Sequence, residues 1–174
     1  MAIEIERKFL IEDINQIASV IVNDSIEKID ICQGYLSTNP EVRVRTCGYC
    51  TGPLSEQKCI STLTVKSPSS AGGLQRFEYE YEIPFGDANL MMFLCENRII
   101  KKTRYKLNNS WEIDVYQGKL SGLIIAEFEM KSAEEVINLP YWLGKEVTKD
   151  LDYKNSSLIS KGLFLVTKAG FAGR

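Results

Sequence analysis

The strongest constraint on how this chain folds is a repeated alternation of charged and uncharged residues. The opening segment, MAIEIERKFL, places Glu4, Glu6 and Lys8 at every second position. Successive side chains of a β-strand point to opposite faces, so this period predicts a strand with one charged face. The same period recurs in EVRVRT, LTVKS, QRFEYEYE, KKTRY, WEIDV and AEFEM, so most of the chain is expected to form strands.

Eight strands and four helices are predicted. The strands cover residues 2–11, 31–37, 41–47, 60–67, 75–84, 99–106, 110–116 and 124–131. Short strands joined by Gly-, Pro- and Asn-rich turns indicate antiparallel pairing. The helices are expected at residues 13–23, at 87–97, after the capping box Ser132-x-x-Glu135, and at about 154–163. In the second helix, Asp87 is the predicted N-cap, and Leu90, Met91 and Leu94 form the predicted buried face.

The length and the lack of a linker indicate one domain, residues 1–174, with a loosely packed tail at 164–174. The net charge of −2 gives no overall attraction to nucleic acid or to an acidic membrane. The chain has no long apolar run, and its N-terminus is charged within four residues, so a cytoplasmic protein is expected.

The charged faces hold eight acids and seven bases, often in same-sign pairs. Two such charges at positions i and i+2 lie ~7 Å apart and repel each other, which is a poor design for a solvated face. The alternative is a barrel whose charged faces converge inside and whose apolar faces are covered outside. A cavity with both signs suits a metal-bound polyphosphate, because arginine and lysine bind phosphate and carboxylates bind Mg²⁺ or Mn²⁺.

Histidine is absent, which excludes catalytic triads and histidine-ligated zinc. Any chemistry must use carboxylates, lysine, arginine, tyrosine or a metal. Cys47, Cys50 and Cys59 have part of the spacing of a zinc site, but no histidine can complete it, so reduced cysteines in a hairpin are the favoured reading. Whether these three cysteines bind anything stays open.

The segment Glu4-Ile5-Glu6-Arg7-Lys8 resembles the ExExK signature of the CYTH superfamily, also called triphosphate tunnel metalloenzymes. The blocks that follow, up to VTKDLDYKN, are similar to later family motifs in the same order, across residues 2–160. The resemblance implies an α+β, mainly β fold: an eight-stranded antiparallel closed barrel, or tunnel, with helices packed outside. It also implies metal-dependent hydrolysis of inorganic triphosphate to diphosphate and phosphate.

The resemblance further implies roles for the charged residues. Two ions, Mg²⁺ or Mn²⁺, are expected on the carboxylates Glu4, Glu6, Asp114, Glu127 and Glu129. The substrate is expected on the bases Lys8, Arg43, Arg45, Lys66, Arg76, Lys102 and Arg104. Lys102, Glu78 and Asp114 are the expected catalytic residues, with carboxylates taking the proton of a water and Lys102 stabilising the leaving diphosphate.

Other positions and functions stay open. Tyr35, Lys149 and Tyr153 resemble family positions without a fixed role. The alternative functions are a class IV-type adenylyl cyclase, a thiamine triphosphatase and a non-catalytic polyanion-binding barrel. Relatives also leave a homodimer open. Tyr79 and Tyr81, on an apolar face, are expected in the core, and so are Trp111 and Trp142.

Overall fold

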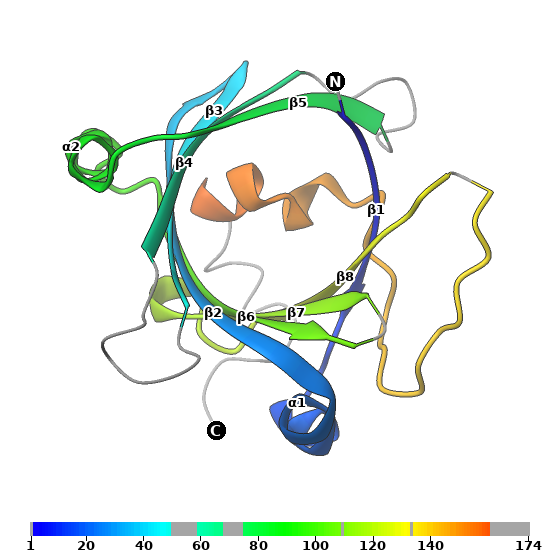
Figure 1. Cartoon of the computed structure of the whole chain (residues 1–174). Coiled ribbons are helices and arrows are strands. Elements are labelled where there is room, and N and C mark those ends of the chain that lie inside the picture. Colours follow the sequence, from blue (N-terminus) through cyan, green and yellow to red (C-terminus); the bar gives the residue numbers. More distant parts are fainter. Residues whose placement is uncertain (1, 50–58, 68–74, 109, 133, 161–174) are drawn as a thin grey trace.

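The structure, a computed structural model, describes residues 2–49, 59–67, 75–108, 110–132 and 134–160. Eight strands dominate it (Figure 1). They are β1 (Ala2–Leu10), β2 (Ser25–Thr38), β3 (Glu41–Tyr49), β4 (Cys59–Lys66), β5 (Gln75–Glu82), β6 (Ile99–Leu107), β7 (Trp111–Tyr116) and β8 (Ile124–Glu129). Each neighbouring pair is antiparallel, so the prediction of eight antiparallel strands is confirmed.

The strands follow one another around a barrel in the order β1-β5-β4-β3-β2-β6-β7-β8, and β1 joins the two ends of the sheet. Its first half, Ala2–Ile5, pairs with β5, and its second half, Glu6–Leu10, pairs with β8. In the described residues, therefore, no position of β1 pairs with a strand on both sides. The pairing of β1 therefore changes from β5 to β8 between Ile5 and Glu6, and we call this position the seam of the barrel.

Residues 144–148 occupy the edge that β5 leaves free at the seam. The Leu10 amide donates to the Lys145 carbonyl at 2.9 Å, and the Val147 amide donates to the Lys8 carbonyl at 2.8 Å. Gly144 makes this approach possible, because a Cβ there would lie 2.8 Å from the Leu10 carbonyl oxygen. On the outside, Arg7 and Glu146 tie the same two segments together with paired hydrogen bonds of 2.9 and 2.6 Å.

The two helices labelled in Figure 1 pack outside the barrel. They are α1 (Ala18–Asp24), preceded by a 3₁₀ turn at Ile14–Gln16, and α2 (Phe85–Leu94). Further 3₁₀ turns cover Gly118–Leu120 and Leu151–Tyr153, and residues 155–160 are helical. Asp13 caps the first turn, accepting from the Asn15 amide. None of the helices in the described residues is long and apolar enough to cross a membrane.

One helix prediction is wrong, and another is confirmed as a helix but wrong in its N-cap and in part of its buried face. The α2 helix begins at Phe85, two residues before the predicted cap, and it exposes Leu90 and Leu94 instead of burying them. The capping box at Ser132 opens no helix in residues 134–140, and the Glu135 carboxylate accepts from the Lys131 amide instead of the Ser132 amide. The last helix is confirmed as far as residue 160, and its predicted end lies outside the described residues.

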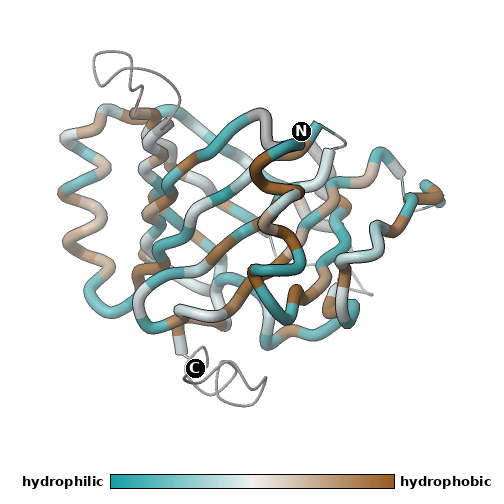
Figure 2. Tube along the Cα trace, turned by 90° about the horizontal axis from the view of Figure 1, so that it is seen from below, coloured by the Kyte–Doolittle hydropathy of each residue, from teal (hydrophilic) through white to brown (hydrophobic). Residues whose placement is uncertain are grey.

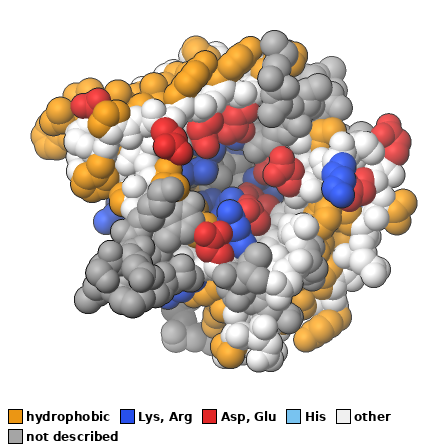
Figure 3. Space-filling view, viewed as in Figure 1, with side chains coloured by type: hydrophobic (Ala, Val, Ile, Leu, Met, Phe, Trp, Pro, Cys, Tyr) orange, Lys and Arg blue, Asp and Glu red, His pale blue; other side chains and the backbone are white. Residues whose placement is uncertain are grey.

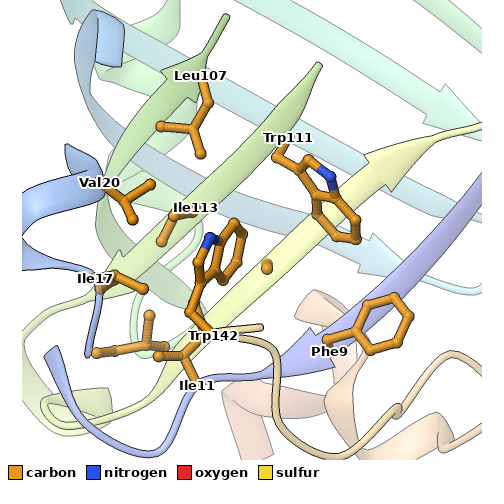
Figure 4. Packing of buried hydrophobic residues seen from close by; sticks show 10 residues of the cluster. Phe9, Ile11, Ile17, Val20, Leu107, Trp111, Ile113 and Trp142 are labelled. Atoms are coloured by element: carbon orange, nitrogen blue, oxygen red, sulfur yellow. The ribbon is translucent and has the colours of Figure 1, made fainter. Parts of the chain in front are cut away.

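Two apolar clusters cover the outer face of the barrel. One surrounds Trp111 and Trp142, whose ring centroids lie 5.7 Å apart, and it seats α1 through Ile17 and Val20 (Figure 4). This confirms both tryptophans as core residues. The second joins α2 to β3 through Ala88, Cys95 and Val44. Along the strands, hydrophilic and hydrophobic residues alternate as predicted (Figure 2).

Tyr79 and Tyr81 of β5, predicted to lie in the core, are 43% and 61% exposed, so that prediction is wrong. The helix α2 packs on β2, β3 and β4, which leaves these two side chains on the outer side of β5 uncovered.

A third cluster fills one end of the barrel interior. Its strand residues share a face with the inward charged residues, since Tyr116 pairs with Lys102 and Ile125 with Asp114. Leu158, from the helix at residues 155–160, is buried among them. The expectation that the helices pack outside is therefore wrong for this one, because its apolar side chain closes the apolar end of the interior (Figure 1).

Candidate active site

The charged residues of the strands meet in a hollow inside the barrel. A cavity of about 410 Å³ opens there, and Figure 3 shows acidic and basic side chains gathered in it. The orientation predicted from the strand period is confirmed for the described side chains that line it: Glu6, Lys8, Arg43, Arg45, Lys66, Glu78, Arg104, Glu127 and Glu129. The side chains of Glu4 and Arg76 lie outside the described part, although their backbones pair with each other.

On one wall, from β1, β6, β7 and β8, every described base is matched by carboxylates. Arg104 donates from Nε and from one terminal nitrogen to the two Asp114 oxygens, both at 2.7 Å. It also reaches Glu127 at 2.6 Å and Glu112. Lys8 lies between Glu127 and Glu6. This network keeps the wall electrically balanced while no ligand is bound.

Lys102 lies deepest in this wall. Its ammonium is fully buried, donates to Asp114 and sits 5.5 Å from the centre of the Tyr116 ring. Burial lowers the pKa of Lys102 to about 8, and Arg104 adds to this, while Asp114 opposes it. The lysine is not among the side chains that line the open cavity, so it stands behind Arg104 rather than beside the free space.

Burial disfavours the charged forms of Asp114 and Glu127, but the bases around them outweigh it. Arg104 and Lys102 lower the pKa of Asp114, and Lys8 and Arg104 hold the pKa of Glu127 well below its usual range. Both groups are therefore stable anions and weak proton acceptors in the ligand-free site.

The opposite wall, from β3, β4 and β5, is less balanced. Glu78 pairs with Lys66 at 2.6 Å and with Arg43 at 3.4 Å. Glu80 accepts from Thr64. Arg45 makes no ion pair within the described residues; it donates one long bond of 3.4 Å to Gln33, and its Nε atom has no partner there. Burial and the charges of Arg43 and Arg104 lower the pKa of Arg45, as expected for a cation that lacks an anion.

Carboxylates gather at the mouth of the cavity. Glu6 of β1 pairs directly with Glu129 of β8, and both line the cavity, where Glu80 and Glu112 join them. Like charges directly opposite on neighbouring strands are unfavourable unless a cation lies between them. These oxygen donors fit a hard divalent ion. Within the described residues, however, no three acidic or cysteine side chains converge on one point.

One cavity residue was not foreseen. Asn155 lines the inner end and accepts a 2.7 Å hydrogen bond from the Tyr116 hydroxyl. It belongs to the VTKDLDYKN block, whose Lys149 and Tyr153 were singled out instead. Lys149 is exposed, and Tyr153 packs against the apolar cluster that also buries Tyr35. An asparagine that begins a helix is common, so spacing alone gave no signal for it.

The cysteine pattern contributes nothing to the site. Cys47 and Cys59 are free thiols at neighbouring positions of β3 and β4, while Cys50 lies outside the described residues. The zinc alternative therefore gains no support from the part of the hairpin that the structure describes.

Comparison with known proteins identifies the family. Residues 2–163 match the model of the CYTH domain family. The chain belongs to the CYTH family. Dependence on divalent metal is general in this family. The carboxylate-rich mouth fits that requirement.

Two curated relatives carry the name inorganic triphosphatase. The one from Acetivibrio thermocellus is 46% identical over 101 residues, which cover 56% of this chain and 64% of that protein, less than two thirds of its length. The one from Nitrosomonas europaea is 35% identical over 164 residues, which cover 89% of this chain and 95% of that protein. The crystal structure of the inorganic triphosphatase NE1496 superposes with a TM-score of 0.59 and 32% identity, covering 94% of this chain and 96% of that one.

Proposed function

We propose that this protein hydrolyses inorganic triphosphate to diphosphate and phosphate inside the barrel, with Mg²⁺ or Mn²⁺ as cofactor. The observation that carries the proposal is Arg45, a partly buried side chain whose buried Nε atom has no partner and which makes no ion pair in the described residues, facing a cavity of about 410 Å³. A buried charge without a partner is costly unless a ligand supplies the opposite charge. The two curated relatives named inorganic triphosphatase point to the same substrate.

The bases would hold the triphosphate along its length. Arg43, Arg45 and Lys66 form one side of the grip, and Lys8 and Arg104 form the other. Arginine binds phosphate oxygens with paired donors, and lysine binds them as a point charge. Arg76 is proposed to extend the first side. The barrel would then act as a tunnel with one open end.

The carboxylates divide into two groups. Glu6, Glu129 and Glu4 are proposed to hold metal, with Glu127 becoming available as the phosphates take over Arg104 and Lys8. Asp114, predicted as a metal ligand, is proposed to stay paired with Lys102 and Arg104. We propose that two ions bind, as the family resemblance implies. A bound divalent cation would neutralise phosphate charge and lower the pKa of a water molecule.

The hydrolytic step adds a water oxygen to the terminal phosphorus and breaks its bond to the bridging oxygen of the leaving diphosphate. Glu78, held between Lys66 and Arg43, is proposed to orient this water and accept its proton. Lys102 and Arg104 would stabilise the charge that develops on diphosphate. Asp114, a weak base here, is proposed to act by positioning these two cations.

The test is phosphate release from inorganic triphosphate, ATP and thiamine triphosphate, each with Mg²⁺, with Mn²⁺ and with a chelator. We expect triphosphate to be the best substrate and the chelator to abolish the activity. Glu129→Gln should reduce the rate by ~10²–10³-fold, as for loss of other groups that stabilise transition-state charge. The exposed acid Glu134, which is not among the cavity-lining residues, provides the matched control Glu134→Gln.

The same assay separates the other functions. Cyclic AMP from ATP would identify a cyclase, and preference for thiamine triphosphate would change the substrate assignment. Anion binding without turnover, or hydrolysis that survives the chelator, would overturn the proposed mechanism. A cytoplasmic location and the lack of nucleic-acid or membrane partners stay predictions.

A further inference from the structure

One side chain of the cavity differs from all the others in chemistry. Among the described residues that line the cavity, Asn155 is the one without a formal charge, and it comes from the helix at residues 155–160 instead of from a strand. A side-chain amide has two different ends, because its oxygen accepts hydrogen bonds and its nitrogen carries two protons to donate. The role of Asn155 therefore depends on which end faces the cavity.

Tyr116 fixes the orientation of this amide. The Tyr116 side chain is buried, and its hydroxyl donates to Asn155 Oδ1 at 2.7 Å. A phenol has only one proton to donate. If the amide were turned over, Nδ2 would face the hydroxyl and the phenol proton would lose this acceptor in a buried position, which is unfavourable. The bond therefore holds Oδ1 against β7 and leaves Nδ2 on the other side of the amide.

The Asn155 nitrogen is unused in the empty site. Within the part of the chain that the structure describes, the bond from Tyr116 is the one hydrogen bond of this side chain, so Nδ2 donates to no protein group there. The side chain is half-buried and borders the cavity of about 410 Å³. Because buried amide protons normally have an acceptor, a ligand in this space is the natural partner of Nδ2.

Asn155 lies where the charged half of the interior meets the apolar half. Tyr116 belongs to the apolar cluster at the inner end, and Leu158, one turn further along the helix, is buried in the same cluster. A cation at this boundary would leave water against apolar side chains, which is costly in the empty protein. A neutral amide avoids this cost and can still donate to an anion. The strand bases surround a ligand from the sides, whereas Asn155 faces it from the closed end.

We propose that Asn155 is a substrate-binding residue: Nδ2 donates to an oxygen of the phosphoryl group that enters furthest into the barrel, while Tyr116 holds Oδ1. This inference rests on the proposed function, because it takes triphosphate as the ligand. A fixed donor at the closed end sets the depth to which the row of phosphates enters. It thereby determines which phosphorus lies beside the carboxylates nearer the mouth.

The test uses two substitutions that separate the two ends of the amide. Asn155→Ala removes both the acceptor and the donor. Asn155→Asp keeps an acceptor for the Tyr116 hydroxyl but replaces the donor with an anion at neutral pH. Binding is measured by isothermal titration calorimetry with Mg²⁺ and bis-methylene triphosphate, whose bridging CH₂ groups prevent hydrolysis. The denaturant midpoint measures stability.

The proposal predicts opposite orders in the two measurements. Asn155→Ala should bind the analogue ~10-fold more weakly, the value of a hydrogen bond to a charged group. Asn155→Asp should bind it ~10²-fold more weakly or worse, because repulsion between the anions is added. In stability, Asn155→Asp should equal or exceed Asn155→Ala, since Tyr116 keeps an acceptor. A residue that only supports Tyr116 would give the same order in both measurements.

Two further variants control the result. Asn138→Asp makes the same change of charge at an exposed position that does not line the cavity, so it should bind the analogue as the unmodified protein does. Tyr116→Phe removes the bond that holds the amide, so it should weaken binding by less than Asn155→Ala. Because the two residues act together, Asn155→Ala should cost less affinity in the Tyr116→Phe protein.

Three results would overturn the proposal. They are an Asn155→Ala variant that binds the analogue as tightly as the unmodified protein, an Asn155→Asp variant that binds it more tightly than Asn155→Ala, and an unmodified protein that does not bind it. Phosphate release judges the proposed function separately. A protein that shows the expected order of binding but does not hydrolyse triphosphate would refute the reaction and retain Asn155 as a phosphate ligand.

Discussion

At the scale of single residues, the charged groups of the site differ in how fully they are paired with groups of opposite charge. Arg104 is held by three carboxylates, while Arg45 has none within the described residues. A matched cation contributes to the stability of the empty protein. An unmatched one lowers that stability and is available to a ligand.

Arg45 should therefore affect stability and activity in opposite directions. Arg45→Met removes a partly buried charge that has no ion pair in the described residues, and we expect the free energy of unfolding to rise by ~1 kcal/mol. We also expect kcat/KM for triphosphate to fall by ~10–10²-fold, the value of a lost charge-assisted hydrogen bond. Denaturant titration and a phosphate-release assay measure the two effects.

The control for Arg45 is Lys101→Met, which removes an exposed cation whose β2 pair, Cys32, lies on the outer face of the barrel. It should leave both quantities nearly unchanged. If Arg45→Met lowered stability while leaving kcat/KM intact, the guanidinium would be structural and not a phosphate ligand.

Lys102 should set the alkaline limit of activity. Its pKa of about 8 means that the ammonium is charged below this pH and neutral above it. Because kcat/KM reports ionisations of the free enzyme, we expect it to fall as the pH rises through 8. Lys102→Arg keeps the charge throughout, so its slower reaction should lack this decline. An identical decline in that variant would rule out Lys102 as its cause.

The lowered pKa of Lys102 also makes the stability of the fold depend on pH, in the opposite direction from the activity. An unfolded lysine keeps its proton up to its ordinary pKa of 10.5, so between pH 8 and 10.5 the unfolded chain binds more protons. The contribution of Lys102 to stability therefore rises with pH across this window. Between pH 8 and 10.5, the activity should therefore fall while the contribution of Lys102 to stability rises.

At the scale of elements, the seam of the barrel depends on a short segment that is not one of the eight strands. Residues 144–148 lie beside the half of β1 that β5 does not reach, and at Gly144 a Cβ would have no room beside the Leu10 carbonyl. The main chain of residues 144–148 thus pairs with the part of β1 that has no partner in β5. This segment also leads directly into the helix that closes the inner end.

Gly144→Ala tests this contact. The added Cβ would meet the Leu10 carbonyl oxygen at 2.8 Å, and neither backbone can move without breaking its pairing. We expect a loss of ~1–3 kcal/mol in the free energy of unfolding, the usual cost of overpacking. Gly86→Ala is the control: its Cβ would have no neighbour within 4 Å, and alanine in α2 should be neutral or slightly stabilising. Equal stabilities for the two variants would contradict the close approach.

Elements with a clear period could be predicted from sequence, and elements that depend on tertiary contacts could not. Six of the eight strands are recognisable because charged residues recur every second residue: β1, β3, β5, β6, β7 and β8. The period also predicts that these side chains share a cavity. It does not predict that Glu6 lies opposite Glu129, because register depends on turns and on the seam.

The errors have a common physical origin. Leu90, Leu94, Tyr79 and Tyr81 were expected to be buried because apolar residues usually are, and a single chain does not reveal which apolar face remains uncovered. Asn155 was missed because it reaches the cavity from a helix that follows all the strands. The approach of that helix depends on Leu158 and not on a local motif.

At the scale of the whole molecule, the interior is divided along the barrel axis. Charged residues line the open half, and an apolar cluster around Tyr35, Tyr116 and Leu158 fills the other half. Asn155 lies at the boundary, with its side chain bonded to Tyr116. The helix at residues 155–160 therefore belongs both to the core and to the site.

Leu158→Ala should destabilise the fold. The side chain is 1% exposed, and truncating a buried leucine typically costs ~2–5 kcal/mol. Val136→Ala, at a side chain that is 96% exposed, should change stability by less than ~0.5 kcal/mol. Denaturant unfolding compares them. A Leu158→Ala cost as small as that of Val136→Ala would show that the helix does not seal the interior.

The apolar seal at the inner end determines how molecules must travel. In the proposed reaction, substrate would enter and products would leave through the same opening of the described barrel, in opposite directions. Diphosphate that stays bound would block the entry of the next triphosphate, so the product would inhibit the enzyme. Turnover in a cell would then depend on how fast other reactions clear diphosphate from outside the barrel.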